Sequence, residues 1–394
     1  MRARILVIDR MPRPDNDSGS ASTFSYLQIL SRAGFDVTFA PKSLKRAERY
    51  AKALEALGIK VLSSPEWPSL IAVIDAFAPR SDIVLLYRVD VAKLLFDRVR
   101  QVAPSAKILF HAVDLHFLRN QRKAAVTGIQ TDAHAASHER AIELNLIAKA
   151  DASIVVSKYE FDLLRELVPA ANLHRIPILR ETPRRPAGSA WQWSARHLSR
   201  ALGPFGRWLN PRDRTLQRRR DVLFIGAYRH SPNADAVQWF VREVWPIIQA
   251  RGFPHRFIIA GSHVPDEIAA LASDKIEVRG RVENLEQLFA ACRLSVAPLR
   301  YGAGLKGKVV TSLSLGVPVV ATSIAAEGAG LRDGENILIA DDPGAMADQI
   351  IRLYDDTVLW QRLSENGYKA FQSSFSHAAG AKKILDVLNG LVAR

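Results

Sequence analysis

Cysteine is almost absent from this sequence, because Cys292 is the only one among 394 residues. A lone thiol forms no disulfide within the chain, which argues against a small secreted domain held together by disulfides. Uncharged apolar stretches are also short, and none approaches the roughly 18 to 20 residues that a membrane-spanning helix needs. Residues 1–20 contain no apolar core followed by a small-residue cleavage site. We therefore expect a cytoplasmic protein without a membrane span.

The chain is too long for one ordinary hydrophobic core, and 48% of its residues are hydrophobic. Short β-rich apolar runs alternate with helix-length stretches in both halves, at residues 4–9, 35–41, 82–88, 106–114 and 152–157, and again at 221–228, 255–261, 275–280, 294–299, 317–323 and 335–342. This alternation predicts two doubly wound parallel α/β units. We expect an N-terminal domain, a linker or insertion, a C-terminal domain and a last helix, over residues 1–179, 180–220, 221–375 and 376–394.

The net charge of +14 is concentrated in one segment. Between Arg180 and Arg220 there are eleven arginines against Glu181 and Asp213, together with three of the seven tryptophans. Arginine mixed with tryptophan is typical of contact with an anionic membrane surface, so segment 186–218 predicts peripheral binding to the inner face of the plasma membrane. The alternative is that its aromatic residues cover a domain while the arginines face solvent. We expect no nucleic-acid partner, since no nucleic-acid motif accompanies the charge.

Two glycine-containing loops follow predicted strands, where ligands bind in open parallel sheets. The first has Gly19 between Ser18 and Ser20, and its backbone N–H groups are candidates to bind a phosphate or a sugar, although a plain helix cap has the same residues. The second, with Gly302 and Gly304, leads into a helix that we expect to begin near Lys306. A helix N-terminus with Lys306 and Lys308 suits a diphosphate, whereas the alternative is a solvated face of two lysines.

The C-terminal half resembles the retaining, family-4-like glycosyltransferases of the GT-B type. The resemblance rests on the glycine-rich loop, the helix after it and a closing Gly-x-Pro-Val-Val, which here is Gly316, Pro318, Val319 and Val320. Further segments follow in the family's order, beginning at Phe224, Phe257, Arg279 and Glu335, and thinner ones occur in the first half, at Ile108 and Ala150.

The resemblance implies the GT-B fold, in which two Rossmann-like domains face each other across a cleft and a C-terminal helix often returns to the N-terminal domain. It implies a nucleotide-diphosphate sugar as donor, with no metal and no cofactor. The expected reaction moves a hexose or deoxyhexose to a saccharide or lipid-linked saccharide, in the biosynthesis of a cell-surface polysaccharide or glycolipid. Transfer with retention of configuration is the family expectation.

Site residues follow from the matching positions. His116 is expected at the reacting sugar, with Asp114 orienting it or binding acceptor hydroxyls; the alternative for His116 is a buried structural role, and two potential ligands are too few for a metal site. Ser18, Gly19 and Ser20 are expected to bind the acceptor. The donor is expected to contact Gly226, Arg229, His230, Gly261, Ser262, Gly302, Gly304, Lys306, Lys308, Thr311 and Glu327, the last of which is equally a candidate surface charge.

The sequence departs from the family at the nucleotide site. Thr311 occupies the position of a glutamate that generally accepts hydrogen bonds from the ribose, and a hydroxyl lacks the charge and bidentate reach of a carboxylate. Ala227 and Asn233 stand where relatives often have Arg and Lys; Arg229 and His230 remain in that loop, and Lys306 or Lys308 is expected to supply the second charge. The rival interpretations are a catalytically weak GT-B partner, a sugar-nucleotide-binding protein and, with less support, a sugar-nucleotide epimerase.

Overall fold

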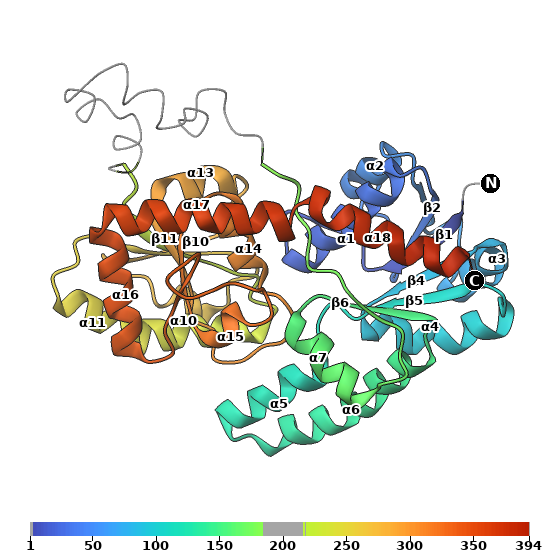
Figure 1. The fold of residues 1–394 in the computed structure, drawn as a ribbon, viewed down its shortest axis with the longest axis horizontal. Helices are drawn as coiled ribbons and strands as arrows, with labels where there is room; N and C mark the ends of the chain where they lie inside the picture. Colours follow the sequence, from blue (N-terminus) through green and yellow to red (C-terminus); the bar gives the residue numbers. More distant parts are fainter. Residues whose placement is uncertain (1–2, 184–215, 217, 394) are drawn as a thin grey trace.

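The computed structural model describes residues 3–183, 216 and 218–393. Within these ranges the chain forms two α/β domains, each built on one parallel sheet (Figure 1). The prediction of two Rossmann-like domains is confirmed. The Arg- and Trp-rich segment 186–218 lies outside the described residues, except for Leu216 and Arg218.

The N-terminal sheet has seven strands in the order β3-β2-β1-β4-β5-β6-β7. The strands are β1 Arg4–Asp9, β2 Asp36–Pro41, β3 Lys60–Val61, β4 Ile83–Tyr87, β5 Lys107–His111, β6 Ala152–Val155 and β7 Leu173–Arg175. The helices are α1 Ser18–Arg32, α2 Glu48–Glu55, α3 Leu70–Phe77, the 3-10 turn η1 Ala78–Arg80, α4 Val89–Val102, α5 His116–Thr127, α6 Gln130–Lys149 and α7 Lys158–Leu167. The strand order reverses at β1, which places the loops after β1 and β4 at the edge where such sheets bind ligands.

The C-terminal sheet has six strands in the order β10-β9-β8-β11-β12-β13. The strands are β8 Asp221–Ile225, β9 Phe257–Ala260, β10 Ile276–Gly280, β11 Cys292–Ala297, β12 Val319–Ala321 and β13 Leu338–Ile339. The helices are α10 Ser231–Trp239, the π-turn η4 Phe240–Val244, α11 Trp245–Ala250, α12 Asp266–Ala269, α13 Leu285–Ala291, α14 Gly307–Ser314, α15 Ser323–Ala326, α16 Pro343–Asp355, α17 Thr357–Ser374 and α18 His377–Val392. All six expected apolar runs contain a strand.

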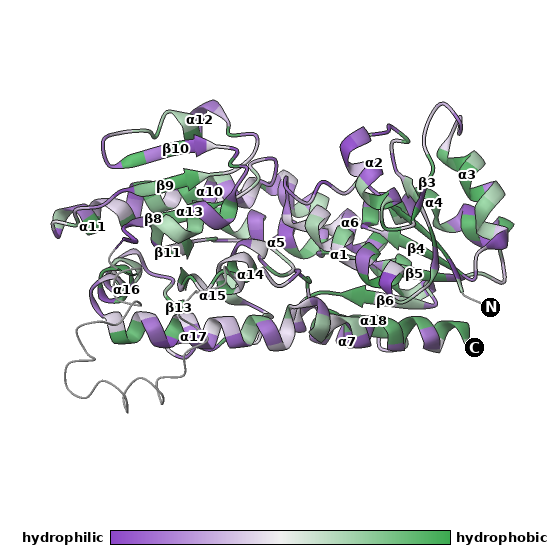
Figure 2. Ribbon diagram, turned by 90° about the horizontal axis from the view of Figure 1, so that it is seen from above, coloured by the Kyte–Doolittle hydropathy of each residue, from purple (hydrophilic) through white to green (hydrophobic). Residues whose placement is uncertain are grey.

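The last two helices run along one side of both domains (Figure 2). α17 packs on the C-terminal domain, and α18 adds four side chains to the core beside β1 and β4 of the N-terminal domain, namely Ile384, Val387, Leu388 and Leu391. Fully burying an aliphatic side chain of this size contributes about 1.5–3 kcal/mol. Docking of α18 is therefore a substantial part of what holds the domains together.

The chain crosses between the domains twice, and the two crossings pair with each other. The backbone N–H of Arg180 donates to the Phe375 carbonyl at 2.8 Å, and the N–H of His377 donates to the Arg180 carbonyl at 3.1 Å. The side chain of Leu179 packs where Gly380 of α18 leaves room for it. None of the helices in the described ranges has the length and apolarity needed to span a bilayer.

Candidate active site in the cleft between the domains

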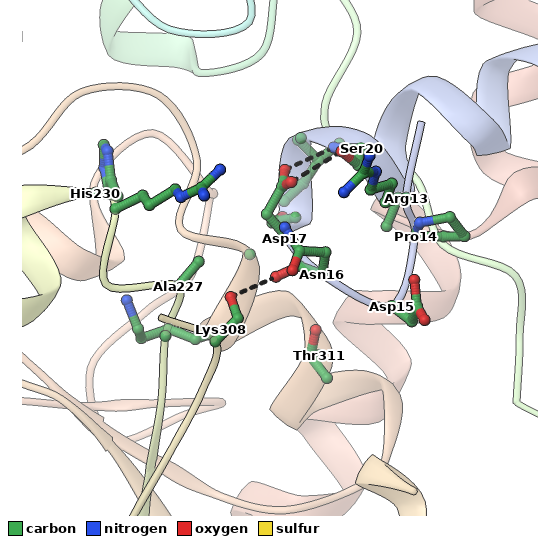
Figure 3. Close-up of a pocket in the computed structure, with 18 of the residues that line it drawn as sticks. Arg13, Pro14, Asp15, Asn16, Asp17, Ser20, Ala227, His230, Lys308 and Thr311 are labelled. Carbon is green, nitrogen blue, oxygen red and sulfur yellow. Dashed lines mark hydrogen bonds between the residues drawn. The ribbon is translucent and has the colours of Figure 1, made fainter. Parts of the chain in front are cut away.

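A cleft of about 1330 Å³ lies between the domains. Its walls come from the loops that follow the carboxyl ends of strands in both sheets, including residues 13–21, 113–114, 225–227, 229–231, 260–263 and 305–308. Figure 3 shows the loop with Asp17 and Ser20 opposite the loop with Ala227 and His230 and the start of α14 with Lys308 and Thr311. Side chains far apart in sequence thus surround one ligand-sized space.

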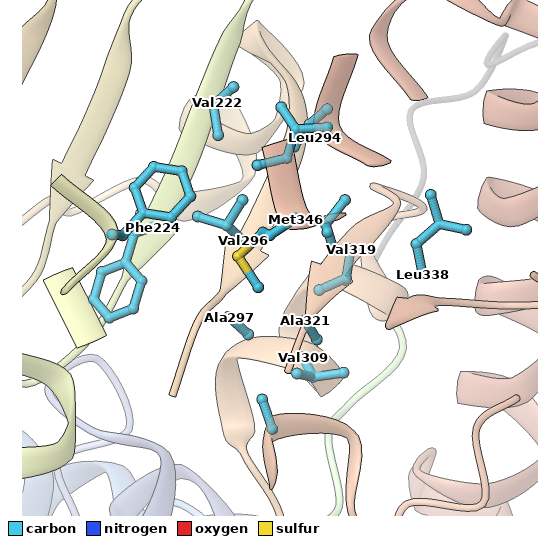
Figure 4. Close-up of a cluster of buried hydrophobic side chains, with 14 of the residues drawn as sticks. Val222, Phe224, Leu294, Val296, Ala297, Val309, Val319, Ala321, Leu338 and Met346 are labelled. Atoms are coloured by element: carbon cyan, nitrogen blue, oxygen red, sulfur yellow. The ribbon is translucent and has the colours of Figure 1, made fainter. Parts of the chain in front are cut away.

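The helix α14 presents its N-terminus to this cleft. Its N-cap residue, Lys306, makes no side-chain cap, and the Val309 N–H donates to the Lys306 carbonyl oxygen at 2.9 Å. The N–H groups of Gly307 and Lys308 are the ones that an anion could bind. The opposite face is anchored because Leu313 and Val309 are buried in the core of the C-terminal domain, where Figure 4 shows Val309. The helix therefore holds its cationic end rigidly against the cleft.

Lys308 is partly buried and pairs with a neutral group. Its Nζ donates to Asn233 Oδ1 at 2.6 Å and lies 5.0 Å from the centre of the Phe224 ring. Burial, helped by the charge of Lys306, lowers the pKa of Lys308 from its usual 10.5 to about 7.

Lys306 is 7% exposed, and its Nζ donates to the Gly304 carbonyl oxygen at 2.9 Å. Burial lowers its pKa to about 8, although the charges of Glu327 and Glu160 oppose this shift. Among the described residues no carboxylate forms an ion pair with Lys306 or Lys308. The two predicted lysines thus both lie at the start of α14, each donating to a neutral oxygen.

Two loops of the C-terminal domain meet beside this pair. A Cβ on Gly261 would lie 1.7 Å from the Gly226 carbonyl oxygen, so these backbones approach as only glycine allows. His230 lies in the loop after β8, and burial lowers its pKa to about 4, which keeps the imidazole neutral near pH 7. Arg229 and Ser262 also line the cleft.

Asp114 and His116 lie in the wall contributed by the N-terminal domain. Asp114 forms an ion pair with Arg119, and its Oδ1 lies 3.8 Å from His116 Nε2. Burial lowers the pKa of His116, and the neighbouring Asp114 opposes that shift. Glu143 of α6 accepts hydrogen bonds from the N–H groups of His116 and Phe117, both at 2.9 Å, and so fixes the start of α5.

Ser18, Gly19 and Ser20, expected in a loop, form the first turn of α1 and line the cleft. Asp17 caps this helix by accepting from Ser20 N and Ser20 Oγ, both at 2.8 Å. Arg180 donates to Ser18 Oγ at 2.6 Å, which ties the loop to the first crossing between the domains. The Asp17 cap already uses the Ser20 N–H, so a ligand here would meet the serine and arginine side chains.

Two of the predicted donor residues, Gly304 and Glu327, do not line the cleft, whereas Thr311 of α14 does. Glu327 is not among the cleft-lining residues; both of its carboxylate oxygens accept from Arg122 of the other domain, at 2.7 and 2.8 Å. The Gly304 N–H is likewise turned away from the cleft, towards Glu160.

Sequence reasoning missed Arg122, Glu160, Glu143 and Arg180. For Glu160 a signal exists, because Ser157 and Glu160 form the Ser-x-x-Glu pattern of a helix N-terminus. That pattern locates α7, and it says nothing of a contact with the other domain. Arg122, Glu143 and Arg180 lie in helical or linker sequence without a distinguishing motif.

Comparisons with known proteins agree with this architecture. The family model described as Glycosyl transferases group 1 matches residues 219–356. A Klebsiella pneumoniae protein described as an uncharacterized 44.6 kDa protein in the cps region is 24% identical over 164 residues, which are 39% of this chain and only 42% of that relative.

Solved structures match over nearly the full chain. Sucrose-phosphate synthase from Thermosynechococcus elongatus superposes with a TM-score of 0.74 at 17% identity, covering 100% of both chains. Anabaena Alr3699/HepE in complex with UDP-glucose superposes at 0.69 with 15% identity, covering 98% of this chain and 99% of that one. A glycosyltransferase from Rickettsia africae superposes at 0.68 with 13% identity, covering 99% of each. The chain therefore has the GT-B fold, and its C-terminal domain matches the glycosyl transferases group 1 family.

Proposed function

We propose that the protein is a glycosyltransferase that takes its sugar from a nucleoside diphosphate sugar. The observation that carries the proposal is the pair Lys306 and Lys308 at the N-terminus of α14, two cations drawn out of water without a carboxylate partner among the described residues. Burying such charges costs free energy unless a counter-charge arrives. A diphosphate is the ligand whose two negative groups match this site.

The donor is proposed to lie along the C-terminal wall. Its diphosphate would meet α14, the two lysines and Arg229, and its ribose would lie beside Thr311. As the bond between the anomeric carbon and the diphosphate oxygen breaks, charge builds on the leaving diphosphate, and fixed cations lower the energy of that transition state. The acceptor oxygen then bonds to the anomeric carbon and passes its proton to an oxygen of the leaving diphosphate.

Asp114 and His116 are proposed to face the transferred sugar from the N-terminal wall. The neutral imidazole can both donate and accept a hydrogen bond, and its side chain remains 21% exposed. Asp114, held by Arg119, is proposed to bind a sugar or acceptor hydroxyl. We place the acceptor along Ser18, Gly19 and Ser20, and we propose transfer with retention of configuration and without a metal ion.

Related proteins support a saccharide product. The Anabaena structures hold UDP-glucose or UDP, and the Klebsiella relative is described by its place in the cps region. We therefore propose a hexose or deoxyhexose as the transferred group and a cell-surface polysaccharide or glycolipid as the pathway, with a saccharide or lipid-linked saccharide as acceptor.

Slow hydrolysis of the donor tests the activity without a known acceptor. Purified protein is incubated with UDP-, GDP- and dTDP-sugars, and free nucleotide is measured against a Lys308→Met variant. Wild-type protein should release nucleotide from at least one sugar nucleotide, and the variant should release it more slowly. Tight binding of a sugar nucleotide without any release would favour the second candidate, a nucleotide-sugar-binding protein. The observation that favours this candidate is Thr311, which occupies the position of the family's ribose-binding glutamate.

We also propose peripheral contact with an anionic membrane through segment 186–218. The support is the eleven arginines between Arg180 and Arg220 and the three tryptophans among them. Flotation with vesicles of anionic lipid should carry the full chain upward and leave behind a variant lacking 186–218. Equal flotation of both would remove the proposal.

A further inference from the structure

The loop Gly302–Gly304 of the C-terminal domain is held by two side chains of the N-terminal domain. Arg122 of α5 donates through Nη1 to the Gly302 carbonyl oxygen at 2.8 Å. Glu160 of α7 accepts from the Gly304 N–H through Oε1 at 2.8 Å. The Gly304 carbonyl oxygen accepts from Lys306 Nζ. The backbone that leads into α14 is therefore fixed from across the cleft.

The same oxygen of Glu160 reaches the proposed catalytic segment. Oε1 also accepts from the N–H of Leu115 at 3.0 Å, and Leu115 lies between Asp114 and His116. Glu160 is only 1% exposed. Burial raises the pKa of this carboxyl group, whereas the hydrogen bond from Leu115 favours its charged form. One carboxylate oxygen thus joins the segment facing the sugar to the loop facing the phosphates.

Glu160 departs from the geometry its local sequence predicts. In a capping box the glutamate turns back towards the backbone N–H of the N-cap residue. Ser157 keeps its half of the motif, since its Oγ accepts from Glu160 N at 3.1 Å, and it donates to Glu160 Oε2 at 3.0 Å. The other carboxylate oxygen points out of the helix to Leu115 and Gly304. The side chain therefore serves a contact between domains.

The contact is tight enough to need glycine. Gly304 has a φ of +64°, and a Cβ on it would lie 3.0 Å from Asp114 Cβ and 3.1 Å from the Val113 carbonyl oxygen. Beside it, Arg122 forms a bidentate ion pair with Glu327. The Lys158 N–H donates to the Gly328 carbonyl oxygen at 3.1 Å. Every one of these bonds is lost if the domains separate.

We propose that Glu160 and Arg122 are positioning residues that give the donor loop its phosphate-binding shape only when the two domains are closed. The identity of the ligand rests on the proposed function, whereas the contacts between the domains do not. In the closed state the Gly302–Gly304 backbone orients Lys306 and the start of α14. Opening releases Gly302 O and Gly304 N together, so the site for the diphosphate loosens at the moment when product must leave.

Small-angle scattering and calorimetry with UDP as the probe test this proposal. We expect wild-type protein with UDP to scatter as the closed structure. Glu160→Leu should scatter as a more extended particle and bind UDP roughly ten- to a hundredfold more weakly, the factor expected from losing a hydrogen bond to a charged group. Glu160→Gln keeps an oxygen acceptor at the same place and should restore most of the compaction.

Two matched controls separate positioning from general damage. Glu143 is equally buried and also accepts two backbone N–H bonds, but both come from its own domain, so Glu143→Leu should lower the unfolding midpoint without extending the particle. Arg98 forms a bidentate pair with Asp75 inside the N-terminal domain, at 2.7 Å for both bonds. Arg98→Met should therefore leave scattering unchanged, whereas Arg122→Met should extend the particle.

The outcomes distinguish this inference from the proposed function. If UDP binds neither to wild type nor to any variant, UDP is excluded as the nucleotide of the donor. The positioning role is then tested by comparing the scattering of nucleotide-free Glu160→Leu with that of nucleotide-free wild type. If Glu160→Leu and Arg122→Met scatter as wild type with and without UDP, the positioning role is overturned. A loss of compaction in Glu143→Leu equal to that in Glu160→Leu would overturn it as well.

Discussion

Lys308 and Lys306 carry ammonium groups whose ordinary pKa is far above neutrality, yet their pKa values lie at about 7 and about 8. The cause is burial in both, and a bound diphosphate would reverse it, because a nearby negative charge favours the protonated amine. An anion bound at this site would therefore raise the pKa of both amines.

This gives a pH dependence of nucleotide binding. Above about pH 7 the free protein loses the Lys308 proton, and above about pH 8 that of Lys306, whereas the complex keeps both. Binding should then take up protons, and the affinity for a nucleoside diphosphate should fall as pH rises from about 7 to 9. Titration calorimetry in two buffers of different ionisation enthalpy measures this uptake; a constant affinity with no uptake would contradict it.

Thr311 should contribute little compared with the lysines. A threonine hydroxyl offers the ribose one neutral hydrogen bond, which is worth about 0.5–1.5 kcal/mol. Thr311→Val keeps the shape of the side chain and should therefore weaken nucleotide binding by roughly two- to tenfold. A loss of more than a hundredfold would show that Thr311 has a larger role than a single hydrogen bond.

Some cleft-lining residues were predictable from sequence and others were not, for a physical reason. Gly19, Lys306 and Lys308 lie at the N-termini of helices that follow a strand, and topology brings strand ends to the same edge. Glu327 was expected at the donor, yet its carboxylate is paired with Arg122 of the other domain. Glu160 was unexpected because a capping pattern fixes the helix and leaves the carboxylate free to turn. Contacts between domains have no local sequence signal.

At the scale of elements, the short β-rich apolar runs were sufficient to find eleven of the strands. β3 and β7 were missed because they contain two and three residues, too few to show a pattern. Asp342 and Pro343 are the residue types typical of a helix start, and Asp342 Oδ1 indeed accepts from Ala345 N at 3.0 Å to cap α16.

The docking of α18 depends on one glycine. A Cβ at Gly380 would lie 2.2 Å from Leu179 Cδ1, and Leu179 is fully buried, whereas a Cβ at Gly390 of the same helix meets nothing within 4 Å. Gly380→Ala should therefore overpack the contact and destabilise the protein by about 1–3 kcal/mol. Gly390→Ala should be neutral or stabilise by up to about 1 kcal/mol, since alanine favours helices.

Thermal or urea unfolding of both variants measures the difference. The two substitutions are chemically identical and lie on the same helix, so helix propensity cancels between them. Equal unfolding midpoints would show that α18 does not pack against Leu179 as described.

At the scale of the whole molecule, the two domains meet on both sides of the cleft. Arg122 and Glu160 join them on one side, and on the other Arg281 forms an ion pair with Asp15 at 2.6 Å and Ser262 Oγ donates to the Asn16 carbonyl oxygen at 3.2 Å. The GT-B fold was predictable because each half carries its own alternation of strands and helices. The closed arrangement was not, since it depends on side chains that meet only after both domains have folded.

Binding of nucleoside diphosphates is the most direct test of the proposed glycosyltransferase site. UDP, GDP, dTDP and CDP are titrated calorimetrically into wild-type protein and into Lys308→Met, which removes one cation from the start of α14. At least one of the four should bind the wild type, and the variant should bind it roughly tenfold or more weakly, as expected for a lost charged hydrogen bond. Absence of binding by all four, or equal affinity in the two proteins, would contradict a diphosphate site at Lys306 and Lys308.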